Sequence, residues 1–252
     1  MQINGNTVFI PGATSGIGLA LALRLRAAGN TVVVGGRRQA LLDEIAATHG
    51  IEGVRIDTAD ADSIADASAE ILRRFPDLNV LVTMAGVMRA EDWHTAGFLA
   101  DAEAQVVTNL LGPIRLIAAF TAHLQARPDA TIVTVSSGLA FAPLRVTPTY
   151  NATKAAIHML SETLRLQLAD TSVRVLELEP PAVRTALMPG QEESEFAMPL
   201  DDFADEVIEI LRTQPEATEI QVENVKFLRY GEARGDYSQV VSTLNELDPH
   251  GH

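Results

Sequence analysis

The chain contains no cysteine, so disulfides, thiolate nucleophiles and cysteine-based zinc sites are excluded. No uninterrupted apolar run approaches the roughly 20 residues that span a membrane, and the first residues lack the basic-then-apolar order of a signal peptide. Basic residues are also scarce, with 19 Lys and Arg against 33 Asp and Glu and a net charge of −14. These features predict a cytoplasmic protein that binds neither membranes nor nucleic acid. A phosphate ligand would need a local positive site.

The remaining pattern alternates short strands with helices along all 252 residues, without a repeat or a linker. The expected strands are apolar on both faces, which is typical of a parallel sheet covered on both sides. They occupy residues 7–10, 31–34, 54–56, 80–82, 131–135 and 173–176. We therefore expect residues 1–252 to form a single α/β domain, a Rossmann-type doubly wound parallel β-sheet with helices on both faces. Ligands bind such sheets at the carboxyl ends of the strands.

A glycine-rich turn, Pro11-Gly12-Ala13-Thr14-Ser15-Gly16-Ile17-Gly18, joins the first strand to the first helix. Glycines let the backbone approach a diphosphate, and a helix N-terminus offers free N–H groups to it. The alternative is a plain tight turn. The strand–turn–helix context favours a nucleotide site, with contacts from Gly12, Thr14, Ser15, Gly16, Ile17 and Gly18.

The G-x-x-x-G-x-G spacing resembles the short-chain dehydrogenase/reductase (SDR) family, whose fingerprint is T-G-x-x-x-G-x-G. Thr83-Met84-Ala85-Gly86 is similar to the family's N-N-A-G, and the resemblance implies that Ala85 and Gly86 lie at the adenosine half of the cofactor. Pro11, Thr83 and Met84 depart from the family pattern. Their counterparts are neighbours in the family, so we expect this contact to be apolar here.

The residues after the second strand indicate which cofactor is bound. An acidic residue there accepts hydrogen bonds from the adenosine ribose in NAD-binding proteins, but this chain has Gly36 followed by Arg37 and Arg38. A guanidinium suits a 2′-phosphate, so we predict NADP(H); the alternative is two surface arginines that begin a helix. The resemblance implies that Asp57, beside Thr58, contacts the adenine, although Asp57 could instead cap the next helix.

The chemistry is expected from a serine that ends a strand and a tyrosine–lysine pair on the following helix. Ser137 lies thirteen residues before Tyr150, and Lys154 lies one helical turn after it. A lone pair of this kind is usually solvated, but its order relative to the glycine turn matches the SDR family. The resemblance implies that Ser137 orients a carbonyl and Tyr150 is the acid/base. We expect Lys154 to lower the pKa of the phenol from about 10 and to bind the nicotinamide ribose.

Two further motifs carry expected site residues. Asn109-Leu110-Leu111-Gly112 resembles the family's N-x-x-G, which implies that Asn109 holds a water that relays protons to Lys154; the alternative is a buried amide with its own partners. The segment Pro180 to Thr185 resembles P-P-x-V-x-T. It implies that Pro180, Val183 and Thr185 contact the nicotinamide and that the pro-S hydride is transferred.

A lid at about residues 185–200 mixes Leu, Met and Phe with Pro-Gly, and no basic cluster accompanies it. We therefore predict a small apolar ketone or aldehyde as substrate. The six histidines lack metal-site spacing, so no catalytic metal is expected; His250 and His252 form only an adventitious pair near the C-terminus. Surplus apolar residues on helices 102–125 and 150–168 predict a homodimer or homotetramer.

These observations together predict an NADP-dependent carbonyl reductase or alcohol dehydrogenase. A catalytically silent NADP-binding regulatory protein is the alternative from another class, although it would not need Ser137, Tyr150 and Lys154 together. An SDR-type epimerase or dehydratase also stays open. A serine hydrolase would need G-x-S-x-G, which Ser136-Ser137-Gly138 does not provide.

Overall fold

The computed structural model describes residues 1–246, so His250 and His252 lie outside the described residues. A seven-stranded sheet with the order β3-β2-β1-β4-β5-β6-β7 forms the centre, and each neighbouring pair is parallel. The strands are β1 (Thr7–Pro11), β2 (Thr31–Gly36), β3 (Glu52–Arg55), β4 (Val80–Thr83), β5 (Ala130–Val135), β6 (Val173–Leu178) and β7 (Glu219–Ile220). The predicted doubly wound α/β fold is confirmed.

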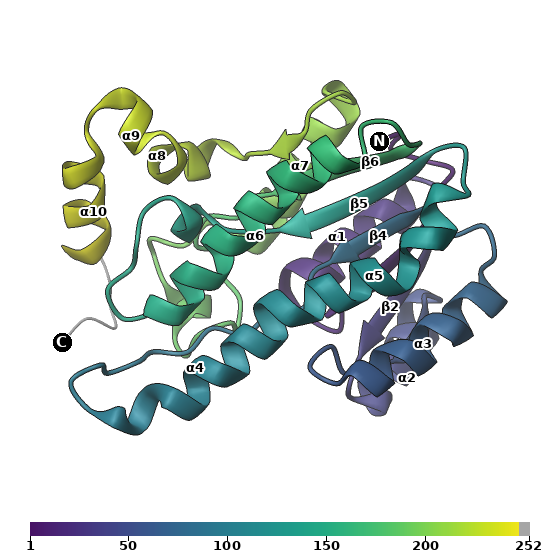
Figure 1. Ribbon diagram of the computed structural model, residues 1–252, viewed down its shortest axis with the longest axis horizontal. Coiled ribbons are helices and arrows are strands. Elements are labelled where there is room, and N and C mark those ends of the chain that lie inside the picture. The colour runs from purple at the N-terminus through teal and green to yellow at the C-terminus, as the bar shows by residue number, and fades with distance from the viewer. Residues whose placement is uncertain (247–252) are drawn as a thin grey trace.

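Helices cover both faces of this sheet (Figure 1). One apolar layer packs under α1 (Gly16–Ala27), α2 (Gln39–His49) and α7 (Leu200–Thr213). The other packs under α3 (Ala61–Arg74), α5 (Gly112–Gln125) and α6 (Pro148–Gln167). Fully buried Phe9 and Phe120 meet in the second layer, with ring centroids 5.8 Å apart. Burying apolar side chains on both faces fixes the strands as the interior of the molecule.

The predicted helix over 102–125 is longer and has an irregular middle. The turn η1 (Ala96–Phe98) and α4 (Leu99–Val106) lead into a π-helical turn, η2 (Val107–Leu111), and then into α5. By length and composition the 30-residue stretch Ala96–Gln125 could cross a membrane. Here its buried residues instead pack against α3, α6 and the sheet.

The C-terminal part adds elements that the sequence pattern did not predict. After η5 (Glu223–Val225), the short helices α8 (Lys226–Arg229), α9 (Gly231–Arg234) and α10 (Tyr237–Glu246) form a small group beyond the carboxyl ends of β5 and β6 (Figure 1). Leu228 and Val240 of this group pack with Ala142, which follows η3 (Gly138–Ala140). The group therefore supports the loop that leaves β5.

Candidate active site

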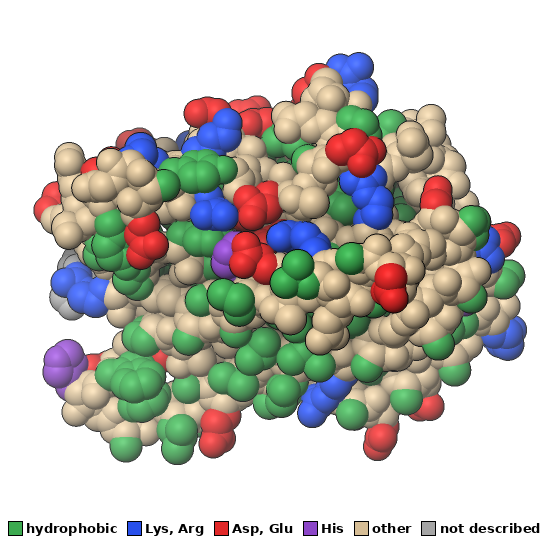
Figure 2. Space-filling view, turned by 45° about the horizontal axis from the view of Figure 1, so that its top comes forward, with side chains coloured by type: hydrophobic (Ala, Val, Ile, Leu, Met, Phe, Trp, Pro, Cys, Tyr) green, Lys and Arg blue, Asp and Glu red, His purple; other side chains and the backbone are tan. Residues whose placement is uncertain are grey.

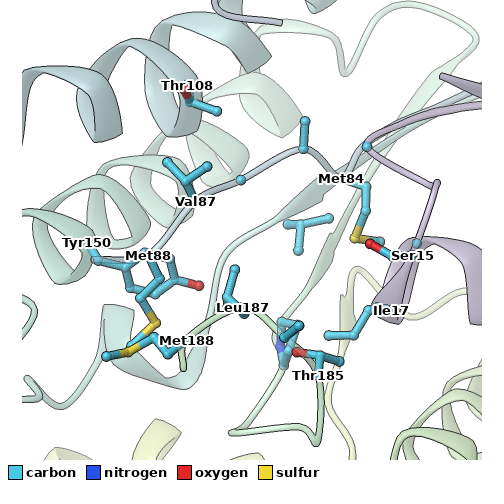
Figure 3. A pocket seen from close by; sticks show the side chains of 18 of the residues that line it. Ser15, Ile17, Met84, Val87, Met88, Thr108, Tyr150, Thr185, Leu187 and Met188 are labelled. Carbon is cyan, nitrogen blue, oxygen red and sulfur yellow. The ribbon is translucent and has the colours of Figure 1, made fainter. Parts of the chain in front are cut away.

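A cavity of about 1000 Å³ opens at the carboxyl ends of the strands. Its wall includes every residue that the sequence predicted for cofactor contact and three of the four predicted for catalysis, while Asn109 lies behind it. Figure 3 shows Ser15, Ile17 and Thr185 toward one end, and Tyr150 with Met88 and Met188 toward the other. A charged, extended cofactor and a small apolar molecule could thus lie end to end.

The glycine turn brings two segments of backbone into contact. Gly12 has a φ of +87°, and a Cβ placed on it would lie 2.5 Å from the Cα of Ala85. Glycine is required here because it adopts the positive φ without strain and because a side chain would collide with the backbone of Ala85 after β4. Ser15 precedes α1 in extended conformation, and its side chain makes no capping bond. The first N–H groups of α1 thus face the cavity, as an anion site requires.

At the end of β2, a side chain at position 36 would crowd the side chain of Thr14. A Cβ on Gly36 would lie 2.5 Å from Cγ2 of Thr14, whereas Arg37 and Arg38 are exposed and line the cavity. Asp57 also lines the cavity and accepts a hydrogen bond from the Ala59 N–H at 3.0 Å. Asp60, not Asp57, caps α3, so the capping alternative for Asp57 is wrong.

Pro11, Thr83 and Met84, the residues that depart from the family pattern, have separate partners in this structure, so the apolar contact expected between them stays a prediction. In the described residues, β1 pairs with β4 at Val8 with Val80 and at Phe9 with Leu81. Pro11 lies beyond these pairs and has no N–H to donate. Met84 packs against Gly18 on α1. Thr83 is buried and turns away, donating to the Val133 carbonyl of β5 at 3.4 Å.

Ser137, Tyr150 and Lys154 are brought together at the floor of the cavity, each at most 6% exposed. The Ser137 hydroxyl donates to the Pro180 carbonyl at 3.4 Å and accepts from the Leu139 N–H at 3.1 Å, because it caps η3. Lys154 Nζ lies 5.4 Å from the centroid of the Tyr150 ring and donates to the Val135 carbonyl at 2.7 Å.

The acid–base balance of this group differs from the expectation. Burial raises the pKa of Tyr150 to about 12, against a smaller lowering by the Ser137 hydroxyl. Burial also lowers the pKa of Lys154 to about 8, and the charge of Glu177 opposes that change. The predicted lowering of the Tyr150 pKa by Lys154 is therefore wrong for this structure. Removing the phenol from water outweighs the charge that was expected to favour phenolate.

Asn109 occupies the π-helical turn η2 and is fully bonded behind the cavity. Its Oδ1 accepts from the Val87 N–H at 2.8 Å, and its Nδ2 donates to the Val87 carbonyl at 2.8 Å. A Cβ on Gly86 would lie 3.4 Å from Asn109 Oδ1 and 3.9 Å from Lys154 Nζ. Asn109 therefore fixes the loop after β4 next to Lys154. The predicted water relay stays a prediction.

The loop after β6 and the predicted lid form one hydrogen-bonded unit. Val183 bridges to Met198, and the Val183 carbonyl accepts from Gln191 Nε2 at 2.7 Å. Arg184 Nε binds the carbonyls of Ser194 and Ala197 at 3.0 and 3.1 Å. The apolar wall on this side consists of Val87, Met88, Pro181, Leu187, Met188 and Pro189.

Sequence reasoning missed several polar residues of the site. Arg89 and Asp101 line the cavity and form an ion pair at 3.3 Å, so this guanidinium is neutralised at the wall. Thr108 also lines the cavity. Two buried carboxylates of the β6 region, Glu177 and Glu179, lie beneath the site. The sequence Val173-Arg174-Val175-Leu176-Glu177 is compatible with an ordinary strand whose last residue is exposed. Only the pairing of β6 with its neighbours in the sheet shows that these carboxylates are buried.

One cluster of described residues has the donors of a cation site. Ligand atoms of His158, Glu177, Glu179 and Glu219 lie within 4.8 Å of one another. Arg165 and Arg229 already pair with these carboxylates at 3.3–3.5 Å. We therefore read the cluster as an ion-pair network.

Comparison with known proteins agrees with this geometry. The family model for short chain dehydrogenase matches residues 6–195. The chain belongs to the short-chain dehydrogenase family. It is 44% identical over 190 residues to the uncharacterized oxidoreductase DltE of Bacillus subtilis (strain 168), covering 74% of this chain and 75% of that protein.

Solved structures of the short-chain dehydrogenase family show the same architecture. An alcohol dehydrogenase from Thermococcus sibiricus, complexed with 5-hydroxy-NADP, superposes with a TM-score of 0.75 at 25% identity, covering 86% of this chain and 95% of that chain. A short chain dehydrogenase from Burkholderia cenocepacia J2315 in complex with NADP reaches a TM-score of 0.81 at 24% identity, covering 97% and 99%. Membership in this family makes the chain an oxidoreductase of the NAD(P)-binding fold.

Proposed function

We propose that this protein is an NADP(H)-dependent carbonyl reductase or alcohol dehydrogenase that interconverts a small apolar ketone or aldehyde and its alcohol. The observation that carries the proposal is one cavity that joins the open N-terminus of α1 and two arginines to the Ser137, Tyr150 and Lys154 group. NADP-bound relatives of the same fold support this choice of cofactor. Gly36, where a side chain would crowd Thr14, offers no carboxylate to an adenosine ribose, which also supports it.

NADPH, when bound, supplies a hydride to the carbonyl carbon. The residues of the chain account for the rest. The Ser137 hydroxyl donates to the carbonyl oxygen and stabilises the negative charge that develops there. Tyr150 gives its phenolic proton to that oxygen as the alcohol forms. A raised phenol pKa suits a donor that must hold its proton until the oxygen becomes strongly basic. The ammonium of Lys154 lies next to the ring of the phenolate that remains, with its Nζ 5.4 Å from the ring centroid.

The proposed substrate class rests on the part of the cavity wall that lies away from Arg37 and Arg38. Its side chains are mainly Val, Met, Leu and Pro, and Arg89 is paired with Asp101. An apolar wall with a few convergent polar groups binds a small apolar molecule. Among the residues that the structure describes, Arg89 on this wall already has an acidic partner, so a strongly anionic substrate would compete with Asp101 for it.

A kinetic test uses a panel of small aryl and alkyl ketones and aldehydes with NADPH, followed by absorbance. We expect turnover on apolar members and a fall of about 10²–10⁴-fold in kcat for Tyr150→Phe. NADPH affinity, measured by fluorescence titration, should be retained in this variant. Tight NADPH binding without turnover on any carbonyl would instead favour a regulatory protein, and equal activity on strongly anionic carbonyls would overturn the substrate class.

We also propose that the protein forms a homo-oligomer in the cytoplasm. The layer of α4, η2, α5 and α6 exposes Val106, Leu111, Ile114, Met159 and Leu166, and hydrophobic side chains gather across this face in Figure 2. An exposed apolar patch of this kind typically forms a contact with another protein chain.

A further inference from the structure

Glu177 of β6 is a carboxylate in the interior of the sheet, with no exposed surface. Its neighbour Thr134 on β5 is also fully buried. Burial of a carboxylate is costly unless hydrogen bonds and opposite charges compensate for the lost water. The partners of Glu177 therefore indicate what the residue does.

Three side chains surround this carboxylate, and all three come from segments that carry catalytic residues: Ser136 precedes Ser137, and His158 and Arg165 lie on α6. Ser136 Oγ donates to Oε1 at 2.5 Å. His158 Nδ1 lies 3.0 Å from both carboxylate oxygens, and Arg165 Nη2 lies 3.3 Å from Oε2. Ser136 immediately precedes Ser137, and His158 lies one helical turn after Lys154 on α6.

A single peptide unit links this carboxylate to the catalytic lysine. Lys154 Nζ donates to the carbonyl of Val135 at 2.7 Å, and Val135 and Ser136 share that peptide. The Ser136 N–H also donates to the Leu178 carbonyl at 3.0 Å. The end of β5 is thus held by Lys154 on one side and by Glu177 on the other.

We propose that Glu177 is a positioning residue for carbonyl reduction: it clamps the end of β5 through Ser136 and holds a negative charge beneath the Lys154 ammonium. The inference rests on the proposed function, since it assigns Lys154 its role in catalysis. Clamping fixes the hydroxyl of Ser137 and the carbonyl that binds Lys154. The charge keeps a buried ammonium protonated.

The electrostatics agree with this geometry. Burial alone lowers the pKa of Lys154, and the charge of Glu177 works against it, leaving a pKa of about 8. The other charged groups around Glu177 are His158, with Glu162 at 3.9 Å from its Nε2, and Arg165. Glu179, Glu219 and Arg229 complete the network. Burial and the Glu177 charge raise the pKa of Glu179 to about 8.

The chain allows a direct measurement, because Lys154 and Lys226 are its two lysines. Protein labelled with ¹³C at the lysine Cε carbons should give two titrating signals, and Lys226→Arg assigns them. Lys226 pairs with Glu223 on the surface and serves as the internal reference. The titration needs no substrate, so it stays informative if no carbonyl is turned over.

We expect Glu177→Gln to lower the Lys154 titration midpoint by about one pH unit. Ser136→Ala removes the clamp but keeps the charge, so it should lower kcat and shift the midpoint by less than half as much. The double variant Glu177→Gln/Glu179→Gln prevents Glu179 from ionising in place of Glu177 and should show at least the same shift. Equal midpoints in wild type and the double variant would overturn the inference, as would equal shifts in Ser136→Ala and Glu177→Gln.

The pH profile of reduction supplies the kinetic readout. Tyr150 and Lys154 must both be protonated for reduction, and loss of the Glu177 charge lowers the pKa of a neighbouring acid. The alkaline limb of kcat should therefore move to lower pH in Glu177→Gln and stay in place in Ser136→Ala. If Glu177→Gln fails to fold, Arg165→Gln decides the question. It removes a cation from the same carboxylate, so the Lys154 midpoint should rise, and no rise overturns the inference.

Discussion

The proposed preference for NADP(H) depends on individual side chains at the end of β2. Gly36 carries no acidic side chain, and Arg37 and Arg38 are exposed beside it. This local positive site lies on a protein of net charge −14. An acidic protein needs a local positive site to bind a phosphate, and these two arginines provide one. Charge-assisted hydrogen bonds act over a few ångströms, whereas the overall charge acts at longer range.

At this scale we predict that Arg37→Ala raises the KM for NADPH by about 10–100-fold, since a hydrogen bond to a charged group contributes roughly 1.5–3 kcal/mol. The KM for NADH should change little, because NADH has no 2′-phosphate. Arg73→Ala is the matched control, since Arg73 is an exposed arginine near the end of α3. An unchanged ratio of the two KM values would contradict the predicted phosphate contact.

Glu179 carries a second prediction at the residue scale. Burial and the Glu177 charge raise its pKa to about 8, above its value in the unfolded chain. Between about pH 4.5 and 8 the folded state therefore binds more protons than the unfolded chain, and stability is lost as pH rises through this range. We expect Glu179→Gln to match the wild-type Tm at pH 5 and to exceed it by about 3 °C or more at pH 8.

Calorimetry at the two pH values tests this expectation. Glu216→Gln is the control, because the Glu216 side chain is 87% exposed. A wild-type Tm that fell no more than that of Glu179→Gln over this range would show that Glu179 is not the group that titrates.

The turn between β1 and α1 shows what an element demands of its residues. Gly12→Ala combines an unfavourable positive φ with a Cβ 2.5 Å from backbone, whereas Gly190 has a φ of +78° and nothing within 4 Å of its added Cβ. We expect Gly190→Ala to cost about 1 kcal/mol for the left-handed conformation. Gly12→Ala should cost about 2 kcal/mol more because of the collision. Urea unfolding measures both, and similar losses would contradict the close approach of β1 and β4.

The elements differ in how far the sequence determines them. The β-branched run at Thr31–Val34 and the helix from Pro148 were predictable, because composition and period agree there. Strand β7 has two residues, too few to show a period. The π-helical turn at Asn109 depends on the bonds to Val87, which no local pattern contains. The role proposed for Glu177 could be inferred only from its partners, Ser136 after β5 and His158 and Arg165 on α6. Contacts across a sheet are set by the whole fold, so the local sequence does not contain them.

At the scale of the whole molecule, the exposed apolar face of α4, η2, α5 and α6 determines the expected assembly. We predict that light scattering gives a mass of two or four times 27.0 kDa. Ile114→Glu combined with Met159→Glu should yield monomers, because charges at a buried contact are strongly unfavourable. Phe227→Glu, at an exposed apolar residue on α8, should leave the assembly intact. A monomeric wild type would refute the proposed oligomer.

The hydrogen bonds between Gln191 and Val183, and between Arg184 and the carbonyls of Ser194 and Ala197, have a kinetic consequence. The segment that closes over the apolar wall is tied to the loop expected to contact the nicotinamide. Because the two segments are bonded to each other, a bound cofactor that orders the loop would also order the wall against which a substrate packs. Cofactor should enter first and leave last, so NADP⁺ should inhibit competitively against NADPH while the alcohol product does not. Release of NADP⁺ would then be the rate-limiting step of turnover, after proton transfer from Tyr150 is complete.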